Sequence, residues 1–600
     1  MSENESADYN SQATWLEAEF SYNPSQNVWS PRSDMGEFGY SDGDENEEYL
    51  LAKLKSVTDR SVMSSELSEG MKDWPSTYHL HHQRCNVFRP IADCLTGPIL
   101  EIGAGCGVLT RYLGELGHSV YALEGSQRRS SIIGERCRDL QNVQVINCNF
   151  QDFNPEKKFK TITLIGVLEY ARVYFGSAGD SDAVDQMLFA VSKILEPDGV
   201  LVLAIENKLG LKYFAGYSED HFGKPMFGIE DRYGPETIAT FGRAELEQRL
   251  KNSGLENVEF AYAFPDYKFP QAVLFEPATA QPYASQLASL VAAANASDRQ
   301  KPDLQHFSMS GAVKSVMENG LGGELANSFI VMARKSNVVA NNSKNDLLAI
   351  HYGSGNRKNA YLKTVTFRSS PDGMRVFRAL MTDHHQESTD HFTLVLEDEN
   401  FCPGVMWTDQ LQKLVLDENW QIGDLKKWSD TWIDALLKEL KFEANNVPNK
   451  RHEIPSRLFD ALPKNLVVTP DGKTRFIDLE WRSKEPIEFG YLFYRGIADS
   501  LKALEIVAHR DQQIEIGQII VSLGTQLGLD FGREDVERYF DRELNFQNSI
   551  SRVRVSDNPI SFLNIREDEY ALRRYQRRYR RKQRRKFKLS QSFLGRLFIN

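Results

Sequence analysis

Short apolar runs alternate with polar stretches along the chain between residues 98 and 206. The runs read PILEIGA, SVYALEG, VQVINCN, TITLIGV and GVLVLAIEN, and each of the first four is followed by a segment that can form a helix. Runs of this length, bounded by turn residues, are typical of buried strands. Because strands that alternate with helices build βαβ units, the pattern predicts an α/β fold with a mainly parallel sheet and helices on both faces.

Two further apolar runs complete the predicted sheet. VEFAYAFP follows Gly254, and ANSFIVMAR comes much later in the chain. We expect these two runs to form a closing antiparallel pair. The segment between them, Gln281 to Leu321, is rich in Ala, Gln and Ser. Since a loop of this length is uncommon in a compact domain, we expect it to be a functional cap or disordered.

The segment before the first strand has two parts. Its beginning is rich in Ser, Asn, Glu and Asp and has little apolar periodicity, so we expect it to be largely disordered apart from a short helix around Glu47 to Lys55. Trp74 to Pro90 mixes aromatic residues with histidines and predicts a leading helix that packs across the first domain. His79, His81 and His82 have no further metal ligand at a suitable spacing, so we predict a packing role for them.

The composition divides the chain into four parts. A polar linker at Ser336 to Asn345 separates two folded regions, and the last part is a charged segment with an apolar end. The predicted parts are a largely disordered acidic segment (1–73), a first α/β domain (74–336), a second α+β domain (346–550) and a basic amphipathic C-terminal helix (560–600).

A glycine-rich loop follows the first predicted strand. Its sequence, Glu101-Ile-Gly-Ala-Gly-Cys-Gly107, precedes a predicted helix at Leu109 to Gly114. The glycines let the backbone turn tightly and approach a ligand closely, and the helix offers free N–H groups to a carboxylate or a phosphate. A dinucleotide-binding loop, which has the spacing GxGxxG, is the competing interpretation.

Two acidic residues favour S-adenosylmethionine (SAM) over a dinucleotide. Glu101 ends the first strand, where its carboxylate can order the loop and face the ammonium group of the cofactor. Glu124 ends the next strand, about 20 residues on, where a carboxylate can accept both ribose hydroxyls. The alternative is a glycine turn that these acids merely cap. The predicted cofactor site comprises Glu101, Gly103, Ala104, Gly105, Gly107, Glu124, Gly125, Asn149, Phe150 and Gly166.

Several longer motifs carry a family resemblance. LEIGAGCGVLTRYLGELG, ALEGSQRRS, LIGVLEYA, AIENKLGLKYFAGYSEDHFG and FPDYKFP together resemble the class I methyltransferase module of bacterial surface-polysaccharide and O-antigen proteins. The resemblance covers about residues 74–336. Its first motif is generic to class I enzymes, whereas the run from Ala204 to Gly223 is far more specific. The resemblance implies a seven-stranded Rossmann-like sheet and SAM as the cofactor.

The candidate catalytic residues follow from the chemistry of methyl transfer. Transfer to oxygen needs an in-line approach and often a base that takes the proton of the acceptor. His221 is the favoured base because a neighbouring carboxylate in Glu219-Asp220-His221 can orient its ring; a histidine with only a packing role is the alternative. Glu169 is the second catalytic candidate. The predicted acceptor-binding residues are Tyr78, Asn207, Lys212 and Glu219.

The second domain contains a fainter constellation. Asp460 and Asn465 have the spacing D-x4-N, and Asp478 ends the next predicted strand. This arrangement resembles the catalytic loop and metal site of small-molecule kinases. The resemblance implies that Asp460 accepts the substrate proton, that Asn465 and Asp478 hold Mg2+, and that Lys363, after a loop at 353–355, pairs with ATP phosphates.

The second domain also departs from the kinase pattern. Leu458 and Phe459 stand where such kinases usually have His-Gly, the nucleotide loop is poor in glycine, and no helix glutamate can be assigned to Lys363. A hairpin with Asp-Gly turn chemistry and two chance acids is the alternative. A bifunctional methyltransferase–kinase of O-antigen synthesis has the same domain order, and we therefore predict a kinase-like fold whose activity stays open.

The C-terminal segment is strongly basic. Eleven Lys and Arg residues lie between Arg573 and Lys588, and apolar residues such as Phe593 and Leu597 follow. Clustered cations attract anionic lipids, and terminal apolar residues can insert into the interface. We expect this segment to dock on an anionic membrane surface or on a partner such as a glycosyltransferase. RNA binding, through tyrosines interleaved with arginine, and a passive helix are the alternatives.

Composition narrows the class of protein. The chain of 600 residues is long enough for several domains, and its net charge of −12 argues against a dedicated nucleic-acid binder. The six cysteines show no CxxC pairing, the first residues are unlike a signal peptide, and no apolar run reaches the about 20 residues of a membrane span. We expect a cytoplasmic protein with peripheral attachment to the inner face of the cytoplasmic membrane.

These features together predict a methyltransferase. The expected reaction is SAM-dependent methylation of a hydroxyl or phosphate on a glycan or glycolipid precursor in cell-surface polysaccharide synthesis. The competing predictions are a methyltransferase that acts on a small metabolite or a protein, and a non-catalytic scaffold that docks glycosyltransferases at the membrane. ATP and Mg2+ are expected only if the second domain is active.

Overall fold

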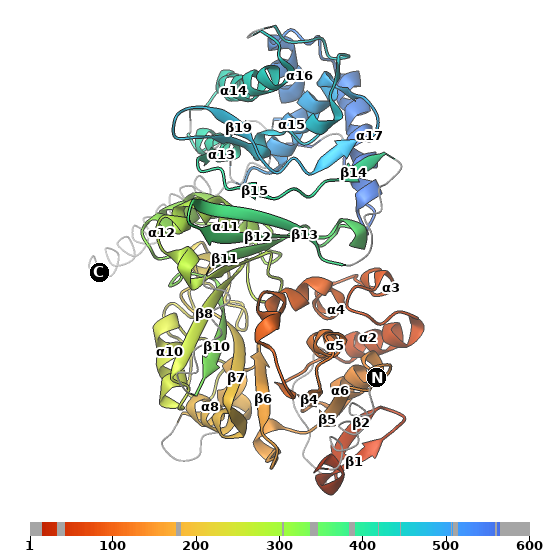
Figure 1. Ribbon diagram of the computed structural model, residues 1–600, viewed down its shortest axis with the longest axis vertical. Coiled ribbons are helices and arrows are strands. Elements are labelled where there is room, and N and C mark those ends of the chain that lie inside the picture. Colours follow the sequence, from red (N-terminus) through yellow and green to blue (C-terminus); the bar gives the residue numbers. More distant parts are fainter. Residues whose placement is uncertain are drawn as a thin grey trace, which may run out of the picture.

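The computed structural model describes residues 15–32, 43–175, 182–302, 305–335, 346–382, 391–417, 419–443, 446–505, 507, 514–558 and 561–563. Along its long axis the molecule has three tiers (Figure 1). The first predicted domain forms the lower tier, a group of antiparallel strands lies above it, and a mainly helical tier closes the top. The predicted linker and the predicted basic C-terminal helix lie outside the described residues.

A seven-stranded sheet organises the lower tier. Its order is β5-β4-β3-β6-β7-β10-β8, with β3 (Ile99–Ile102), β4 (Val120–Glu124), β5 (Val143–Asn147), β6 (Phe159–Ile165), β7 (Leu195–Glu206), β8 (Asn257–Phe264) and β10 (Ser328–Arg334). Strands β3 to β7 are parallel, whereas β10 is antiparallel to both β7 and β8. The predicted Rossmann-like sheet and its closing antiparallel pair are confirmed.

Helices cover both faces of this sheet. They are α5 (Val108–Glu115), α6 (Gln127–Arg136), α7 (Ala171–Tyr174), α8 (Ala183–Ile194), α9 (Leu211–Phe214) and α10 (Arg243–Asn252). The side chains of Ser126 and Asp182 accept hydrogen bonds from first-turn N–H groups and so begin α6 and α8. Successive residues of β7 serve opposite faces, with Val202 in one apolar cluster and Leu203 in the other.

The N-terminal segment departs from the predicted disorder. Strands β1 (Phe20–Asn23) and β2 (Val28–Pro31) form a hairpin, and Trp29 of β2 pairs with Ile146 at the edge of β5. Helix α2 (Asp44–Ser56) contains the predicted short helix, and α3 (Ser65–Ser68) follows it. The prediction of disorder is wrong for these described residues because scattered apolar side chains such as Leu16 and Leu50 are fully buried.

Short helical turns replace the predicted leading helix. They are α4 (Trp74–Leu80), η1 (His82–Val87) and η2 (Arg89–Cys94). The rings of His81 and His82 stack with centroids 4.9 Å apart, and Nε2 of His82 lies 3.1 Å from the carbonyl oxygen of Gly355 in the second region. The packing role predicted for these two histidines is confirmed.

The segment before β10, which was predicted to be a functional cap or disordered, is largely helical in its described residues. Strand β9 (Ala272–Phe275) pairs with β8, and η5 (Glu276–Thr279), α11 (Tyr283–Ala296) and α12 (Met309–Glu318) follow. Helix α11 buries Leu287 and Val291. The alanine-rich composition on which the prediction of a cap or disorder was based is also typical of a helix, because alanine has a high helix propensity.

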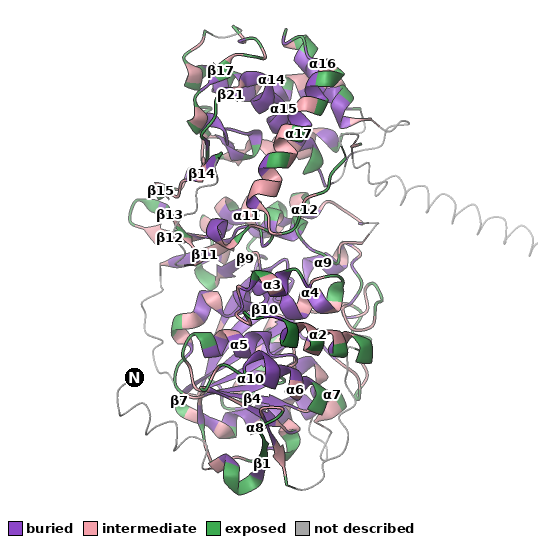
Figure 2. Cartoon of the chain, turned by 90° about the vertical axis from the view of Figure 1, so that its right-hand side faces the viewer, coloured by how far each residue is buried: buried purple, intermediate pink, exposed green. Residues whose placement is uncertain are grey.

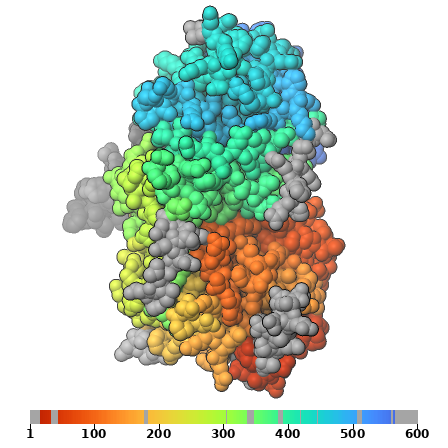
Figure 3. Space-filling model, viewed as in Figure 1, coloured from red at the N-terminus to blue at the C-terminus, as the bar shows by residue number. Residues whose placement is uncertain are grey.

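The second region continues the sheet of the first. Strand β11 (Leu347–Tyr352) pairs with β9, and β12 (Lys363–Ser370), β13 (Gly373–Leu380) and β15 (Glu399–Asn400) extend the ladder. Figure 3 shows the green atoms of these strands seated directly on the orange and yellow atoms of the lower tier. The two predicted domains are therefore joined by backbone hydrogen bonds as well as by side chains.

The upper tier has a second apolar core. Its helices are α13 (Trp407–Val415), α14 (Ile422–Leu440), α15 (Phe489–Lys502), α16 (Ile516–Gln526) and α17 (Arg533–Ile550), with strands β14 (Phe392–Leu394), β16 (Val405–Met406), β17 (Glu453–Ile454), β18 (Leu466–Val468), β19 (Thr474–Phe476), β20 (Trp481–Ser483) and β21 (Ile487–Glu488). Trp432, Phe459 and Tyr491 lie in this core, and Figure 2 shows buried residues concentrated in α14 and α15. Among the described residues, no helix has the length and apolar character that crossing a bilayer requires.

Candidate active site

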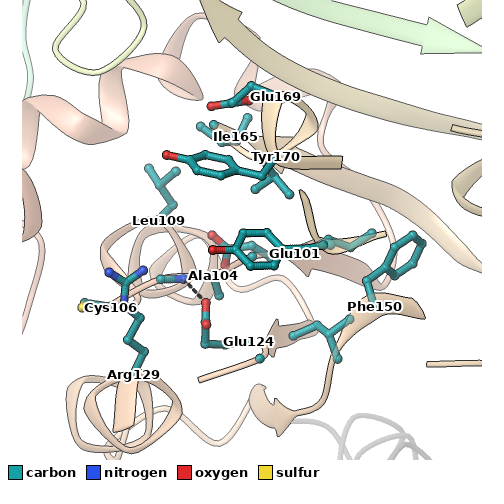
Figure 4. Close-up of a pocket in the computed structure, with 18 of the residues that line it drawn as sticks. Glu101, Ala104, Cys106, Leu109, Glu124, Arg129, Phe150, Ile165, Glu169 and Tyr170 are labelled. Carbon is teal, nitrogen blue, oxygen red and sulfur yellow. Dashed lines mark hydrogen bonds between the residues drawn. The ribbon is translucent and has the colours of Figure 1, made fainter. Parts of the chain in front are cut away.

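A cavity of about 600 Å³ lies at the carboxyl ends of β3, β4, β6 and β7. Nine of the ten predicted cofactor residues line it, all except Gly107. Figure 4 shows Glu124 at one end, Glu169 at the other and Glu101 between them. The carboxyl edge of an open α/β sheet is where ligands collect, so the position agrees with the predicted site.

The glycine loop has the conformation that its sequence predicts. Gly103, Gly105 and Gly107 all have φ in the left-handed region, at 71°, 59° and 79°. A Cβ added at Gly105 would meet nothing within 4 Å, whereas one at Gly107 would lie 3.0 Å from Ile133. Gly107 therefore serves the packing of α5 and does not line the cavity, which corrects its predicted role.

The Glu124 carboxylate holds two loops together. Its Oε2 accepts a hydrogen bond from the Gly105 N–H at 2.8 Å, and its Oε1 accepts one from the Ser126 N–H at 2.9 Å. Burial raises the pKa of Glu124, against the opposing effects of Arg129 and of these hydrogen bonds. Each oxygen keeps a further lone pair that can accept a hydrogen bond from a ligand in the cavity.

Glu101 lies at the floor of the cavity. Its Oε2 accepts a hydrogen bond from Thr110 Oγ1 at 2.6 Å, which ties the end of β3 to α5. Burial raises the pKa of Glu101 to about 8, with the charge of Glu124 adding to the effect and the Thr110 hydrogen bond opposing it. A cationic ligand group in the cavity would favour the ionised form of this buried acid.

His221 lies at the far end of the cavity, where Glu219 orients it as predicted. Its Nδ1 lies 3.0 Å from Glu219 Oε1, and its Nε2 lies 3.9 Å from Glu169 Oε1. Although burial acts to lower it, the hydrogen bond to Glu219 and the charges of Glu206 and Glu169 raise the pKa of His221 to about 9. Burial, with the charge of Glu206, raises the pKa of Glu169 to about 8.

Three further charged residues that the sequence argument omitted line this end of the cavity. Lys268 Nζ contacts both Glu206 and Asp220, the latter at 2.9 Å. Glu206 ends β7 at the same sheet edge as the predicted residues, and Lys268 lies in the motif FPDYKFP. The position of Glu206 at the end of a strand could have identified it as a site residue from the sequence. The position of Lys268 beside Glu206 depends on the conformation of the loop after β8, which the sequence does not reveal.

Aromatic side chains form the walls of the acceptor end. Tyr78, one of the predicted acceptor residues, lines the cavity and stacks under the guanidinium of Arg84 at 4.2 Å. Tyr170 meets the ring of His221 edge-on with centroids 5.5 Å apart. Trp74 and Tyr267 also line the cavity. This end therefore combines flat apolar faces with carboxylates.

The other predicted acceptor residues have supporting roles. Asn207 donates to the carbonyl oxygens of Glu324 and Ala326 at 2.8 and 2.7 Å and is fully buried. Lys212 is buried against Asp220, at 3.3 Å, and neither Asn207 nor Lys212 nor Glu219 lines the cavity. Their proposed substrate contacts are therefore wrong in this structure, because the chain uses their polar atoms to fix the loops that hold the cavity residues.

The predicted residues of the second region also converge. Lys363 Nζ lies 3.1 Å from Asp478 Oδ1, and Asn465 Nδ2 donates to the backbone oxygens of Asp460 and Asp478 at 2.9 and 3.3 Å. Asp478 Oδ1 also accepts from Arg378 Nε at 2.8 Å. The Asp478 carboxylate, which was predicted to hold Mg2+, is therefore already paired with two basic side chains, Lys363 and Arg378.

Two more contacts distinguish this cluster from a nucleotide site. The Asp460 carboxylate, whose pKa burial raises to about 6, lies 3.3 Å from the guanidinium of Arg495. The loop at 353–355 packs against the lower tier, where a Cβ on Gly355 would lie 2.4 Å from Gln83. This loop therefore faces the first domain and not a phosphate site.

Comparison with known proteins finds similarity in the lower tier. Residues 79–260 match the family model of a methyltransferase domain. An rRNA adenine N-6-methyltransferase of Bacteroides fragilis is 27% identical over 175 residues, which cover 28% of this chain and 59% of that protein. The chain thus spans less than two thirds of the length of this curated relative.

The solved structures that the chain matches include two methyltransferases. One, from Thermotoga maritima and described as a possible histamine N-methyltransferase, shares 13% identity over 43% of this chain and 91% of that chain, with a TM-score of 0.25. The other, the CcbJ methyltransferase of Streptomyces caelestis, shares 14% identity over 46% of this chain and 98% of that chain, with a TM-score of 0.27.

Proposed function

We propose that the chain is a SAM-dependent methyltransferase that modifies a glycan or glycolipid precursor of cell-surface polysaccharide. One observation carries the proposal: a single cavity contains the glycine loop with Glu124 at one end and the Glu169–His221 pair at the other. A donor and an acceptor can therefore meet in one enclosed space, which an in-line transfer requires.

The cofactor end fits SAM. The backbone at Gly105 faces open space, so a ligand can approach it closely. Glu124 would accept hydrogen bonds from the ribose, Glu101 would face the ammonium group, and Asn149 with Phe150 would flank the adenine. When bound, SAM supplies a methyl group activated by a sulfonium. The chain orients this group and excludes water from it.

The acceptor end favours a hydroxyl over a phosphate. Carboxylates accept hydrogen bonds from hydroxyl groups, and the flat faces of Tyr78 and Tyr170 suit the apolar face of a sugar ring. Three acids, Glu169, Glu206 and Asp220, line this end, and Lys268 is already paired with two of them, which disfavours a bare phosphate or an RNA backbone. An RNA base, as named for the Bacteroides relative, is therefore the weaker candidate acceptor.

Glu169 is the better placed base for the acceptor proton. His221, with a pKa raised to about 9, carries a proton at neutral pH and so cannot accept another. The ionised Glu169 carboxylate, with its pKa raised to about 8, is a stronger base than an ordinary glutamate. As the new bond from methyl carbon to acceptor oxygen forms, the electrons of the carbon–sulfur bond stay on sulfur and the acceptor proton passes to Glu169.

Thermal unfolding tests cofactor binding directly. We expect saturating SAM to raise the unfolding midpoint of the full chain, and Glu124→Ala to abolish the increase. Glu236→Gln, a change of an exposed glutamate in the same domain, serves as the matched control. A midpoint that saturating SAM leaves unchanged in the wild-type chain would rule out the proposed enzyme and favour the scaffold.

The acceptor is tested in cells. Mass spectrometry of envelope glycans with and without the chain is expected to show a loss of one methyl group per modified unit when the chain is absent. Unchanged glycans, together with SAM binding by the purified chain, would redirect the search to a small metabolite or a protein acceptor.

For the second region we propose a kinase-like arrangement without phosphotransfer. The convergence of Lys363, Asp460, Asn465 and Asp478 supports the arrangement. The residues do not fit Mg2+, because the Asp478 carboxylate is already neutralised by Lys363 and Arg378. We expect ATP with Mg2+ to leave the unfolding midpoint unchanged, and an increase that Asp478→Ala removes would contradict this.

A further inference from the structure

Glu169, Glu206 and His221 converge from three separate segments at the acceptor end of the cavity. Glu169 lies in η4 (Leu168–Tyr170), Glu206 ends β7, and His221 lies in the loop after α9. One ligand atom from each lies within 4.8 Å of the other two. Metal–ligand bonds of about 2.1 Å place ligands on opposite sides of an ion about 4.2 Å apart, so small side-chain rotations bring all three into range.

Two buried carboxylate oxygens at this point are unsatisfied. Glu206 is fully buried and Glu169 is 2% exposed, and Oε2 of each has no hydrogen-bond partner among the described residues. The other oxygen of Glu206 is bound by Lys268. A buried carboxylate oxygen without a partner is costly, so two of them in residues that line one cavity indicate a ligand that supplies positive charge.

The orientation of His221 matches that of a metal ligand. Its Nδ1 is directed to Glu219 Oε1, at 3.0 Å, which leaves Nε2 facing Glu169. Metal binding would displace the proton from Nε2, because a carboxylate that takes the N–H of Nδ1 leaves the other ring nitrogen to present a lone pair. Glu219 also accepts hydrogen bonds from the backbone N–H groups of His221 and Phe222, so its own position is fixed.

The net charge of the surrounding side chains also favours a bound cation. Ion pairs of 4.0 Å or less join five carboxylates to two lysines and one histidine: Glu169, Glu206, Glu219, Asp220 and Asp266 with Lys212, Lys268 and His221. Even with His221 protonated, the acidic side chains outnumber the cations by two, so bound protons or a metal cation must balance the excess. A buried group of charges is stable only when it is paired, and a single divalent cation supplies the missing charge.

We propose that Glu169, Glu206 and His221 bind a divalent metal ion that receives the acceptor. Two carboxylates and one imidazole suit a first-row ion such as Mn2+, and the cavity leaves its remaining positions open to an acceptor oxygen. The ion would orient a sugar hydroxyl toward the methyl donor and favour loss of its proton, which leaves to Glu169 or to water. The role in transfer rests on the proposed function, whereas the binding of the ion does not.

Electron paramagnetic resonance of Mn2+ with the full chain tests this site without any acceptor. We expect one Mn2+ per chain, seen as loss of the sharp spectrum of the aqueous ion. Glu206→Gln and Glu169→Gln are expected to weaken binding about 10- to 100-fold. Glu236→Gln is the surface control, and circular dichroism with the unfolding midpoint shows that each variant is folded.

The outcomes separate this inference from the proposed function. Glu124→Ala is expected to lose the SAM-induced increase in midpoint and to keep Mn2+. A wild-type chain that binds SAM but no Mn2+, or a folded Glu206→Gln that binds Mn2+ as tightly as the wild type, overturns the metal site and leaves the methyltransferase standing. A chain that binds Mn2+ but not SAM removes the proposed function and supports the metal site.

Discussion

The molecule contains two clusters of buried acids, and they differ in how their charge is compensated. In the lower tier, Glu169 and Glu206 line the cavity, and each keeps one buried oxygen without a hydrogen-bond partner among the described residues. In the second region, Asp478 accepts from Lys363 and Arg378, and Asp460 lies against Arg495. The first cluster is incomplete without a ligand, whereas in the second cluster these two aspartates are neutralised by the chain itself.

This contrast shows that a cluster of buried acids whose charge the chain does not balance indicates a ligand site more strongly than the mere convergence of residues does. Both clusters bring together side chains that are far apart in the sequence. In the second region Arg357 and Lys363 lower the pKa of Glu480, although burial acts to raise it. Such pairing stabilises a fold and leaves no place for a metal ion. An incompletely paired cluster is less stable alone, and a ligand that supplies the missing charge binds to it favourably.

The largest expected effect separates the two clusters by activity. Glu169→Gln removes the proposed base and one metal ligand, so methyl transfer is expected to fall about 10²- to 10⁴-fold. Asp478→Asn changes the other cluster and is expected to leave methyl transfer in place. Methylation of envelope glycans in cells that carry each variant measures both effects. Equal losses in the two variants would show that the clusters act together.

The next largest effect is on the stability of the cluster in the second region, where the acids are already paired. Arg357 Nη2 lies 2.7 Å from Glu480 Oε1, and both side chains are largely buried. Arg357→Met leaves a buried acid with less compensation, and breaking such a pair costs about 3 to 5 kcal/mol. Urea unfolding followed by circular dichroism measures the loss, with Arg482→Met, at a more exposed ion pair, as the control. A loss no larger than that of the control would contradict the structural role of this cluster.

The sequence predicted the sheet and the residues that line the glycine-loop end of the cavity, because local signals determine where these residues lie. Apolar runs, three glycines and strand-end acids such as Glu124 each act within a few residues, and the sheet brings strand ends to one edge. The misplaced residues, Asn207 and Lys212, lie in the same motif as His221. Their side chains turn away from the cavity because the backbone oxygens of Glu324 and Ala326 bind Asn207 and the Asp220 carboxylate binds Lys212.

The remaining surprises depend on long-range contacts. Lys268 reaches Glu206 from the loop after β8, and no local pattern reports such a meeting. The N-terminal hairpin is stabilised by burial of isolated apolar residues such as Phe20 in a polar sequence. The pairing of β9 with β11 merges two regions that composition separates at a polar linker. Composition describes the average character of a segment, whereas these contacts depend on single residues.

A smaller effect probes the interface between the two regions. Burial lowers the pKa of His81 from 6.5 to about 3 and that of His82 well below 6.5, with nearby arginines adding to the effect. The unfolded chain therefore binds more protons than the folded chain as the pH falls below 6.5, and stability is lost in that range. The expected loss is about 1.4 kcal/mol for each histidine one pH unit below 6.5.

Unfolding midpoints at neutral and mildly acidic pH measure this dependence. His82→Gln is expected to reduce the difference between the two midpoints, while His391→Gln, at an exposed histidine, is expected to leave it unchanged. A wild-type chain whose midpoint is the same at both pH values would show that these imidazoles are accessible to protons in the folded state.

The smallest expected effect returns to the unpaired acids and has the opposite sign. Glu206→Gln removes one negative charge from a group in which carboxylates outnumber cations, and Lys268 keeps its contact with Asp220 at 2.9 Å. In metal-free buffer we expect the free energy of unfolding of the variant to exceed that of the wild type by about 1 kcal/mol. Binding sites are often less stable without their ligand in this way. Added Mn2+ should reverse the order, because the wild type binds the ion more tightly and so gains more binding free energy from it. A variant less stable than the wild type in metal-free buffer would mean that Glu206 is already compensated, as the acids of the second region are.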